Sequence, residues 1–171
     1  MEPVTLWTSK AFSQDELVTA LLQIGVKRDE NPNRLWDFVV RRGEAIVWID
    51  PDDTEHYPNP EVDALIESKL GEPPQTSIVL HVSREPGSEQ LAMELAIQFA
   101  ERWPCVLDNL SGLARRIFAL GEMQAWCESD QGLLDLPEGV SIPKEWYETD
   151  KVYVASWQRE ELEKQNAEFV E

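Results

Sequence analysis

Thr76-Ser-Ile-Val-Leu-His-Val-Ser83 opens the stretch of sequence, from 76 to 112, on which the fold depends. This apolar run predicts a strand, Pro-Gly-Ser at 86–88 predicts a turn, and apolar residues at three- and four-residue spacing predict a helix over 89–103. Pro104 ends the helix, and Cys105-Val-Leu-Asp108 is the next expected strand. Because strand, helix and strand form a βαβ unit, we expect a parallel pair joined by a right-handed crossover.

An N-terminal helix is marked more clearly than any other element. Ser13 and Glu16 have the spacing of a capping box, and Phe12 and Leu17 have that of a hydrophobic staple. Apolar residues then recur at helical spacing until Gly25, which is suited to end a helix. We therefore expect a helix from Ser13 to Gly25.

Further strands and one more helix are expected before position 76. Residues 4–9 alternate between apolar and polar side chains, which indicates a short strand. Residues 35–40 and 44–49 flank a short link that contains Gly43, which indicates an antiparallel hairpin. Pro60 suits the first position of a helix with an apolar stripe, which Gly71 ends.

The pattern after Gly112 leaves two alternatives open. Residues 113–120 could complete a hairpin and be followed by a short helix over 121–128, or one helix could run from Leu113 to Trp126. Beyond this point, Val152–Trp157 indicates a strand and Gln158–Val170 a terminal helix.

The predicted order β-α-β-β-α-β-α-β indicates an α+β or α/β fold, with helices packed on a mixed β-sheet and an acidic C-terminal extension. Its first six elements have the ferredoxin-like order, although another strand order is compatible with them. A length of 171 residues suits a single domain. We assign residues 1–128 to an α/β core domain and 129–171 to an acidic extension with a terminal helix, packed on the same domain.

The charge is strongly unbalanced, with 33 acidic against 15 basic residues and a net charge of -18. Such a charge disfavours direct contact with nucleic acid or a membrane surface and favours a basic protein partner. A second interpretation is that the acidity only keeps the protein in solution. The oligomeric state does not follow from this pattern.

Catalysis has little support in the sequence, and we predict no enzymatic activity and no cofactor. The loop Asp50-Pro-Asp-Asp-Thr-Glu-His56 could coordinate a hard cation or form a dispersed site, but it lacks the frame of a calcium-binding loop. His81 is expected to be a partly buried, hydrogen-bonded side chain in a strand. Cys105 and Cys127 are expected to be buried thiols.

The candidate partner-binding residues combine aromatic rings with carboxylates. Trp126, Trp146 and Trp157 lie in the acidic C-terminal region, where they could form binding hot spots or hold the extension on the domain. The residues selected as candidates for partner binding are Glu145, Trp146, Tyr147, Glu148, Asp150, Asp50, Asp52, Asp53 and Glu55.

The chain resembles the small acidic α/β proteins of bacteria that neutralise a toxin, the immunity proteins of bacterial competition. The resemblance is carried by the size, the charge and the segment Ser88-Glu-Gln-Leu-Ala-Met-Glu-Leu-Ala-Ile-Gln-Phe-Ala-Glu-Arg-Trp-Pro-Cys-Val-Leu-Asp-Asn109, which is similar to helix–strand units of such proteins. It implies an inhibitor that binds a basic toxin or effector. The alternatives are a nucleic-acid mimic that inhibits a nuclease or restriction enzyme, an enzyme with a site near Asp50–His56, and a housekeeping or scaffold domain.

The expected location is the cytoplasm. The first residues, Met-Glu-Pro-Val-Thr-Leu-Trp, lack the basic and apolar regions of a signal peptide, and no apolar run approaches the length of a membrane span. Two cysteines form no disulfide framework, which agrees with a reducing compartment.

Overall fold

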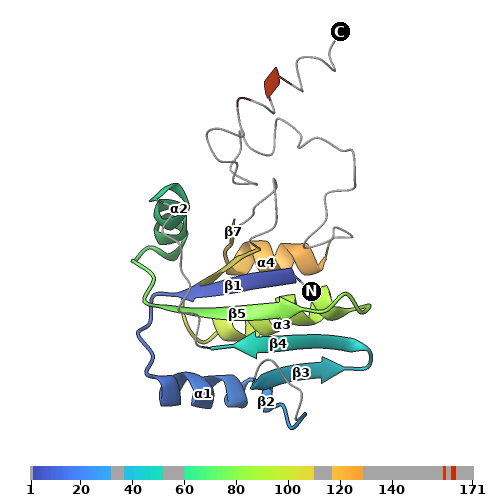
Figure 1. The fold of residues 1–171 in the computed structure, drawn as a ribbon. Helices are drawn as coiled ribbons and strands as arrows, with labels where there is room; N and C mark the ends of the chain where they lie inside the picture. Colours follow the sequence, from blue (N-terminus) through green and yellow to red (C-terminus); the bar gives the residue numbers. More distant parts are fainter. Residues whose placement is uncertain are drawn as a thin grey trace.

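The computed structural model describes residues 2–31, 37–51, 60–109 and 117–128, together with residues 160, 163 and 164. The strands in these ranges are β1 (Glu2–Thr8), β2 (Lys27–Arg28), β3 (Phe38–Arg42), β4 (Ala45–Asp50), β5 (Thr76–Val82), β6 (Cys105–Asp108) and β7 (Ile117–Phe118). The helices are α1 (Gln14–Gln23), α2 (Pro60–Leu70), α3 (Ser88–Ala100) and α4 (Leu120–Cys127). Together they form an α+β fold (Figure 1).

The described strands form one sheet in the order β2-β3-β4-β5-β1-β6-β7, and every pair in it is antiparallel. The prediction of a mixed sheet is therefore wrong. The strands of the expected βαβ unit, β5 and β6, do run in the same direction, because each is antiparallel to β1. They are not hydrogen-bonded to each other, since β1 lies between them and satisfies the backbone groups of both.

The ferredoxin-like arrangement is also absent from the described sheet. That arrangement would place the first strand beside the second strand of the hairpin, which is β4. Instead, β5 lies between β4 and β1. The eight expected elements are present, but β2 is inserted between α1 and β3, so the observed order is not the predicted one.

The N-terminal helix begins as its sequence predicts. The Ser13 hydroxyl accepts a hydrogen bond from the Glu16 amide at 3.2 Å, and the Ser13 amide donates to the Glu16 carboxylate at 3.3 Å. These two bonds form the expected capping box. Gly25 follows the helix with φ of +94°, a conformation that glycine adopts without steric cost.

The structure shifts the predicted end of one helix and the predicted start of one strand, and it decides between the two alternatives for residues 113–126. α3 ends at Ala100 rather than Trp103, because residues 101–103 form a turn before Pro104. β3 begins at Phe38, and the preceding residues 32–36 lie outside the described ranges. Ile117 and Phe118 pair with β6, and α4 begins only at Leu120, so a single helix from Leu113 to Trp126 is wrong.

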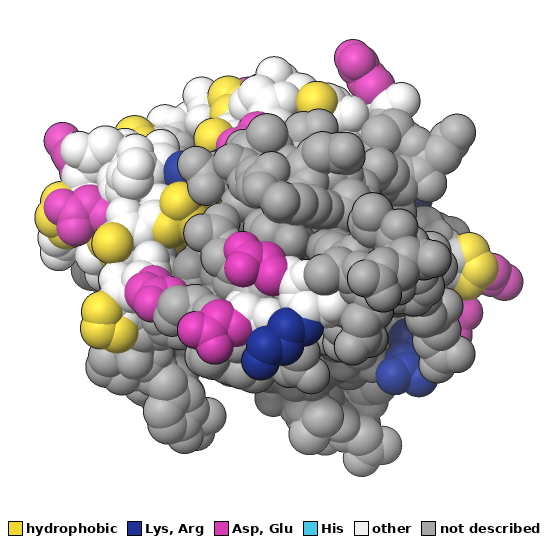
Figure 2. Space-filling view, turned by 90° about the horizontal axis from the view of Figure 1, so that it is seen from above, with side chains coloured by type: hydrophobic (Ala, Val, Ile, Leu, Met, Phe, Trp, Pro, Cys, Tyr) yellow, Lys and Arg dark blue, Asp and Glu magenta, His cyan; other side chains and the backbone are white. Residues whose placement is uncertain are grey.

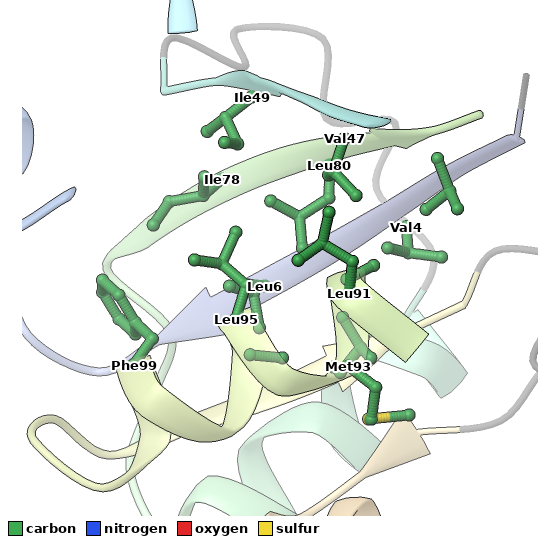
Figure 3. Packing of buried hydrophobic residues seen from close by; sticks show 14 of the residues in the cluster. Val4, Leu6, Val47, Ile49, Ile78, Leu80, Leu91, Met93, Leu95 and Phe99 are labelled. Atoms are coloured by element: carbon green, nitrogen blue, oxygen red, sulfur yellow. The ribbon is translucent and has the colours of Figure 1, made fainter. Parts of the chain in front are cut away.

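The main hydrophobic core lies between α3 and one face of the sheet (Figure 3). Leu91, Leu95 and Phe99 of α3 pack over side chains of β1, β4 and β5. The sheet side chains in this core occupy alternate positions and are almost completely buried: Val4, Leu6, Val47, Ile49, Ile78, Leu80 and Val82. Because successive residues of a strand point to opposite faces, these positions define the covered face. α1 and α4 contribute to the same core.

The opposite face of the sheet is contacted by α2. Trp7 of β1 and Val106 of β6 alternate with the core residues Leu6 and Leu107, so they point away from α3. They form a second cluster with Val62 and Ile66 of α2. The sheet therefore lies between α1, α3 and α4 on one side and α2 on the other.

The C-terminal predictions lie almost entirely outside the described residues. Of the expected terminal helix, only Glu160, Glu163 and Lys164 are described, and they are helical. The strand expected at 152–157 and the domain boundary at 128 stay predictions. None of the described helices has the length and apolar character needed to span a lipid bilayer.

Candidate binding surfaces

The predicted binding residues are mostly outside the part of the chain that the structure describes. Outside the described ranges are five candidates of the C-terminal extension, namely Glu145, Trp146, Tyr147, Glu148 and Asp150. Three candidates of the segment between β4 and α2 are also outside, namely Asp52, Asp53 and Glu55. Asp50 is the one member of the set that is described. The proposed use of the others in partner binding stays a prediction.

Asp50 is the last residue of β4 and is half-buried on the face of the sheet that α2 contacts. Trp48 lies opposite His81 of β5, and Asp50 lies opposite Val79. Because side chains alternate along a strand, Asp50, Trp48 and His81 share this face. A carboxylate, an indole and an imidazole thus come together on two neighbouring strands.

The described residues offer no metal site. Within the described ranges, no group of three or more His, Cys, Asp or Glu side chains is placed to hold a metal ion. Residues 52–56 of the Asp50–His56 segment fall outside those ranges. Half-buried His81 agrees with the sequence expectation of a partly buried strand histidine.

The outer surface of α2 is acidic. Glu61 and Glu67 are exposed on this helix, and Glu72 is exposed just after it. Seen from above, the described surface shows several Asp and Glu side chains on the side where α2 lies (Figure 2). Lys69 is the one basic residue of α2, so the helix presents a net negative surface to a partner.

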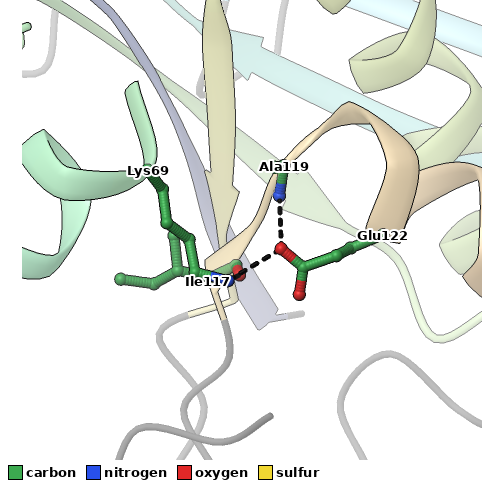
Figure 4. Close-up of polar contacts among 4 residues, drawn as sticks. All are labelled: Lys69, Ile117, Ala119 and Glu122. Atoms are coloured by element: carbon green, nitrogen blue, oxygen red, sulfur yellow. Dashed lines mark hydrogen bonds and ion pairs between the residues drawn. The ribbon is translucent and has the colours of Figure 1, made fainter. Parts of the chain in front are cut away.

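Lys69 is held against the protein and does not offset this charge at the surface (Figure 4). Its ammonium group donates to the Ile117 carbonyl at 2.9 Å and to Glu122 Oε1 at 2.7 Å. The same oxygen of Glu122 accepts from the Ala119 amide at 3.2 Å. These bonds join the end of α2 to β7 and to the start of α4.

Two arginines near the β2 edge of the sheet also have acidic partners. Arg42 donates to Glu94 of α3 at 2.6 Å, and Arg41 lies 3.8 Å from buried Asp29. The bond from Arg42, together with one from Gln90, lowers the pKa of Glu94. The bond and charge of Glu94 in turn raise the pKa of Arg42. Arg41 and Arg42, like Lys69, thus pair with carboxylates within the fold.

A separate groove of about 340 Å³ lies between the segment that links β1 to α1, the exposed side of α1, and the turn after α3. Its lining is mixed in character and consists of Lys10, Phe12, Asp15, Glu16, Thr19, Ala20, Gln23 and Trp103. Phe12 and Trp103 meet edge to face, with ring centroids 5.5 Å apart, and both rest against buried Phe99. The groove therefore combines aromatic rings with carboxylates.

Lys10 places a positive charge over these rings. Its ammonium nitrogen lies 4.8 Å from the centroid of Phe12 and 5.9 Å from that of Trp103. Both distances are within the range of a cation–π interaction. A cation is therefore already accommodated at the aromatic wall of the groove.

Hydrogen bonds fix the segment that carries Lys10 and Phe12. Thr76 donates to the Lys10 carbonyl at 2.9 Å and accepts from the Phe12 amide at 3.2 Å. Thr8 accepts from the Lys10 amide at 3.2 Å and donates to the Pro104 carbonyl at 2.7 Å. Thr76 at the start of β5 and Pro104 after the turn that follows α3 thus help to fix the backbone of the segment that carries Lys10 and Phe12.

Sequence reasoning missed this groove because its two rings are 91 positions apart. The sequence pattern indicates Phe12 only as part of a helix staple and Trp103 only as the end of the expected helix, whereas the structure leaves both side chains half-buried at one groove. Trp126, for which the sequence leaves a binding hot spot and a docking role open, is only 7% exposed and belongs to the core, so the hot-spot alternative is wrong for this residue. The signal that could have revealed the groove is the basic–aromatic–acidic run from Lys10 to Glu16.

The cysteines give no nucleophile. Burial raises the pKa of the Cys105 thiol to about 12, so it is protonated at neutral pH. Burial also raises the pKa of half-buried Cys127. Both thiols are free, and neither has the lowered pKa of a reactive cysteine.

Comparison with protein-family models, with curated proteins and with solved structures gave no match to this chain.

Proposed function

We propose that this protein is a non-enzymatic inhibitor that binds a basic toxin or effector through charge complementarity, in the manner of a bacterial immunity protein acting in the cytoplasm. The observation that supports the proposal is the net charge of -18, combined with an exposed acidic surface on α2. Opposite charges on two proteins accelerate their encounter and disfavour wrong partners.

The arrangement of the cations strengthens this argument. Lys69, Arg41 and Arg42 each pair with a carboxylate of the same chain, so their charges are not free to attract acidic partners. Glu61, Glu67 and Glu72 remain exposed around α2. A partner that approaches this helix meets a negative potential, and the partner chemistry that suits it is basic.

The experiment is a capture from lysate of the native host, at low and at moderate salt, followed by kinetic measurement on the protein retained. We expect a stoichiometric basic partner whose association slows as salt rises, because screening weakens long-range attraction. Its toxic activity should fall when the complex forms. A well-folded sample that captures no basic protein at either salt concentration would refute the proposal.

A matched variant tests the charge rather than the shape of the surface. Replacing Glu61, Glu67 and Glu72 by Gln removes three exposed charges with little change in volume. Association with the captured partner should slow, while dissociation changes less. Competition by duplex DNA for the same partner would point instead to a nucleic-acid mimic that inhibits a nuclease.

A further inference from the structure

We propose that the groove between Phe12, Trp103 and the first turn of α1 binds an arginine side chain of the basic partner. This inference rests on the proposed function, since it assigns one contact point to that partner. It uses a surface distinct from α2, and it depends on geometry that the structure describes.

The groove has the two chemical features that a guanidinium group requires. The rings of Phe12 and Trp103 provide an aromatic wall, and the exposed carboxylates of Asp15 and Glu16 line the same groove. A guanidinium plane stacks on aromatic rings, and its N–H groups match the two oxygens of a carboxylate. Arginine and aromatic residues also dominate binding hot spots.

Lys10 shows that the aromatic wall accepts a cation, and it acts as a weak internal competitor. Lys10 is exposed and lies over both rings, at 4.8 and 5.9 Å from their centroids. An exposed contact of this kind is easily displaced. An incoming arginine can replace the ammonium group over the rings while it also pairs with Asp15 or Glu16.

Apart from the Lys10 side chain, which the arginine displaces, the groove needs no rearrangement to bind. Thr8 and Thr76 fix the backbone around Lys10, and buried Phe99 supports both rings from below. Because its wall is already ordered, binding of a side chain costs little conformational entropy in this protein.

The test is a titration of the full-length 15N-labelled protein with the peptide acetyl-Gly-Arg-Gly-amide, observed through the indole N–H resonance of Trp103. A Trp103→Phe variant assigns that resonance. The matched peptide carries citrulline in place of arginine and so keeps the shape without the charge. We expect the arginine peptide to shift the Trp103 resonance in a saturable manner and the citrulline peptide to leave it unchanged.

Variants of the groove show whether each charged side chain strengthens or weakens binding of the arginine peptide. Combining Asp15→Asn with Glu16→Gln should weaken arginine-peptide binding by about threefold to tenfold, the range expected for two exposed ion pairs. Gln at position 16 preserves the capping box. Lys10→Met should strengthen binding by about twofold to fivefold, because it removes a competing exposed cation.

The control variant removes two carboxylates elsewhere. Glu67 lies on α2, and Glu85 lies in the turn at the far end of β5 from Thr76. Glu67→Gln combined with Glu85→Gln should leave peptide binding within twofold of the original. Equal weakening by both double variants would show a response to net charge alone and would overturn the proposal, as would equal shifts from the two peptides.

The two proposals can fail separately. If the Trp103 resonance responds selectively to arginine but no basic partner is captured, the groove is supported and the inhibitor function fails. If a basic partner binds with equal affinity to the original protein and to the Asp15/Glu16 variant, the groove assignment fails and the function stands.

Discussion

Arg42 and Glu94 show at the scale of single residues how a charged pair joins the end of a strand, β3, to the covering helix α3. Arg42 ends β3, Glu94 lies on α3, and the bond between them is 2.6 Å long. Hydrogen bonds from Arg42 and then from Gln90 lower the pKa of Glu94 relative to an unfolded chain. A carboxyl group with a lowered pKa stabilises the fold only while it is ionised.

We therefore predict that the pair contributes most above the unfolded pKa of glutamate, which is about 4.3, and loses its contribution as the pH falls through the lower folded value. The difference in urea midpoint between the original protein and Arg42→Met should be largest at neutral pH and vanish at strongly acidic pH. The effect should be small, because both side chains are partly exposed and screened by water.

A double-mutant cycle with Glu94→Gln isolates the pair from other effects of the arginine. The coupling should appear at neutral pH and disappear in acid. A coupling that is unchanged in acid would show that packing of the arginine stem, and not the charge of Glu94, joins the two elements.

At the scale of elements, local signals were sufficient wherever they were contained in one segment. The capping box of Ser13 and Glu16 and the placement of Pro60 at the start of α2 were predicted from the sequence and are confirmed. The local pattern could not decide between the two alternatives for residues 113–126. The helical spacing of Leu113, Ile117 and Leu120 is the same in both alternatives, and only pairing of Ile117 with Asp108 decides for a strand.

Lys69 connects elements that lie far apart in the sequence, so we predict that its loss weakens the attachment of α2 to β7 and α4. Lys69→Met keeps most of the aliphatic stem but removes the lysine donor to the Ile117 carbonyl and one of the two donors to Glu122 Oε1, the other being the Ala119 amide. A lost hydrogen bond of a partly buried group costs about 1–2 kcal/mol. Urea unfolding should show a free energy of unfolding lower by about that amount.

Glu67→Met is the matched control for this prediction, because it introduces the same side chain at an exposed position of the same helix. It should change the free energy of unfolding by less than about 0.5 kcal/mol. An equal loss in both variants would attribute the effect to methionine on α2 and contradict a specific role for the lysine.

At the scale of the whole molecule, the position of β1 explains why the sheet could not be predicted. β1 is the first strand of the chain, yet it lies between β5 and β6, and it pairs with residues at least 68 positions away. The pattern of Val4, Leu6 and Trp7 indicates a strand, but it does not indicate which strands lie beside it in the sheet. The sequence of β5, α3 and β6 would read the same whether β5 and β6 paired directly or had β1 between them. The groove was missed for the same reason, since Phe12 and Trp103 meet only once β1 is inserted.

The surplus of acidic charge is the other property of the whole molecule that has a measurable consequence. With a net charge of -18, mutual repulsion opposes the compact state, and dissolved salt reduces that repulsion. Between about 10 mM and about 300 mM NaCl the screening length falls from about 30 Å to below about 10 Å. We therefore predict that the Tm rises over this range and levels off above it.

The size of the rise in Tm measures the free-energy cost of charge repulsion in the folded state. A change of about 1 kcal/mol in the free energy of unfolding corresponds to a change in Tm of about 2–4 °C for a chain of this length. The variant in which Glu61, Glu67 and Glu72 are replaced by Gln should show a higher Tm at low salt and a smaller rise with salt. This would be expected even if the acidic surface of α2 had no partner. A Tm that falls with added NaCl would mean that ion pairs such as those of Lys69 and Arg42 outweigh the repulsion, and the acidic surplus would then carry little cost to folding.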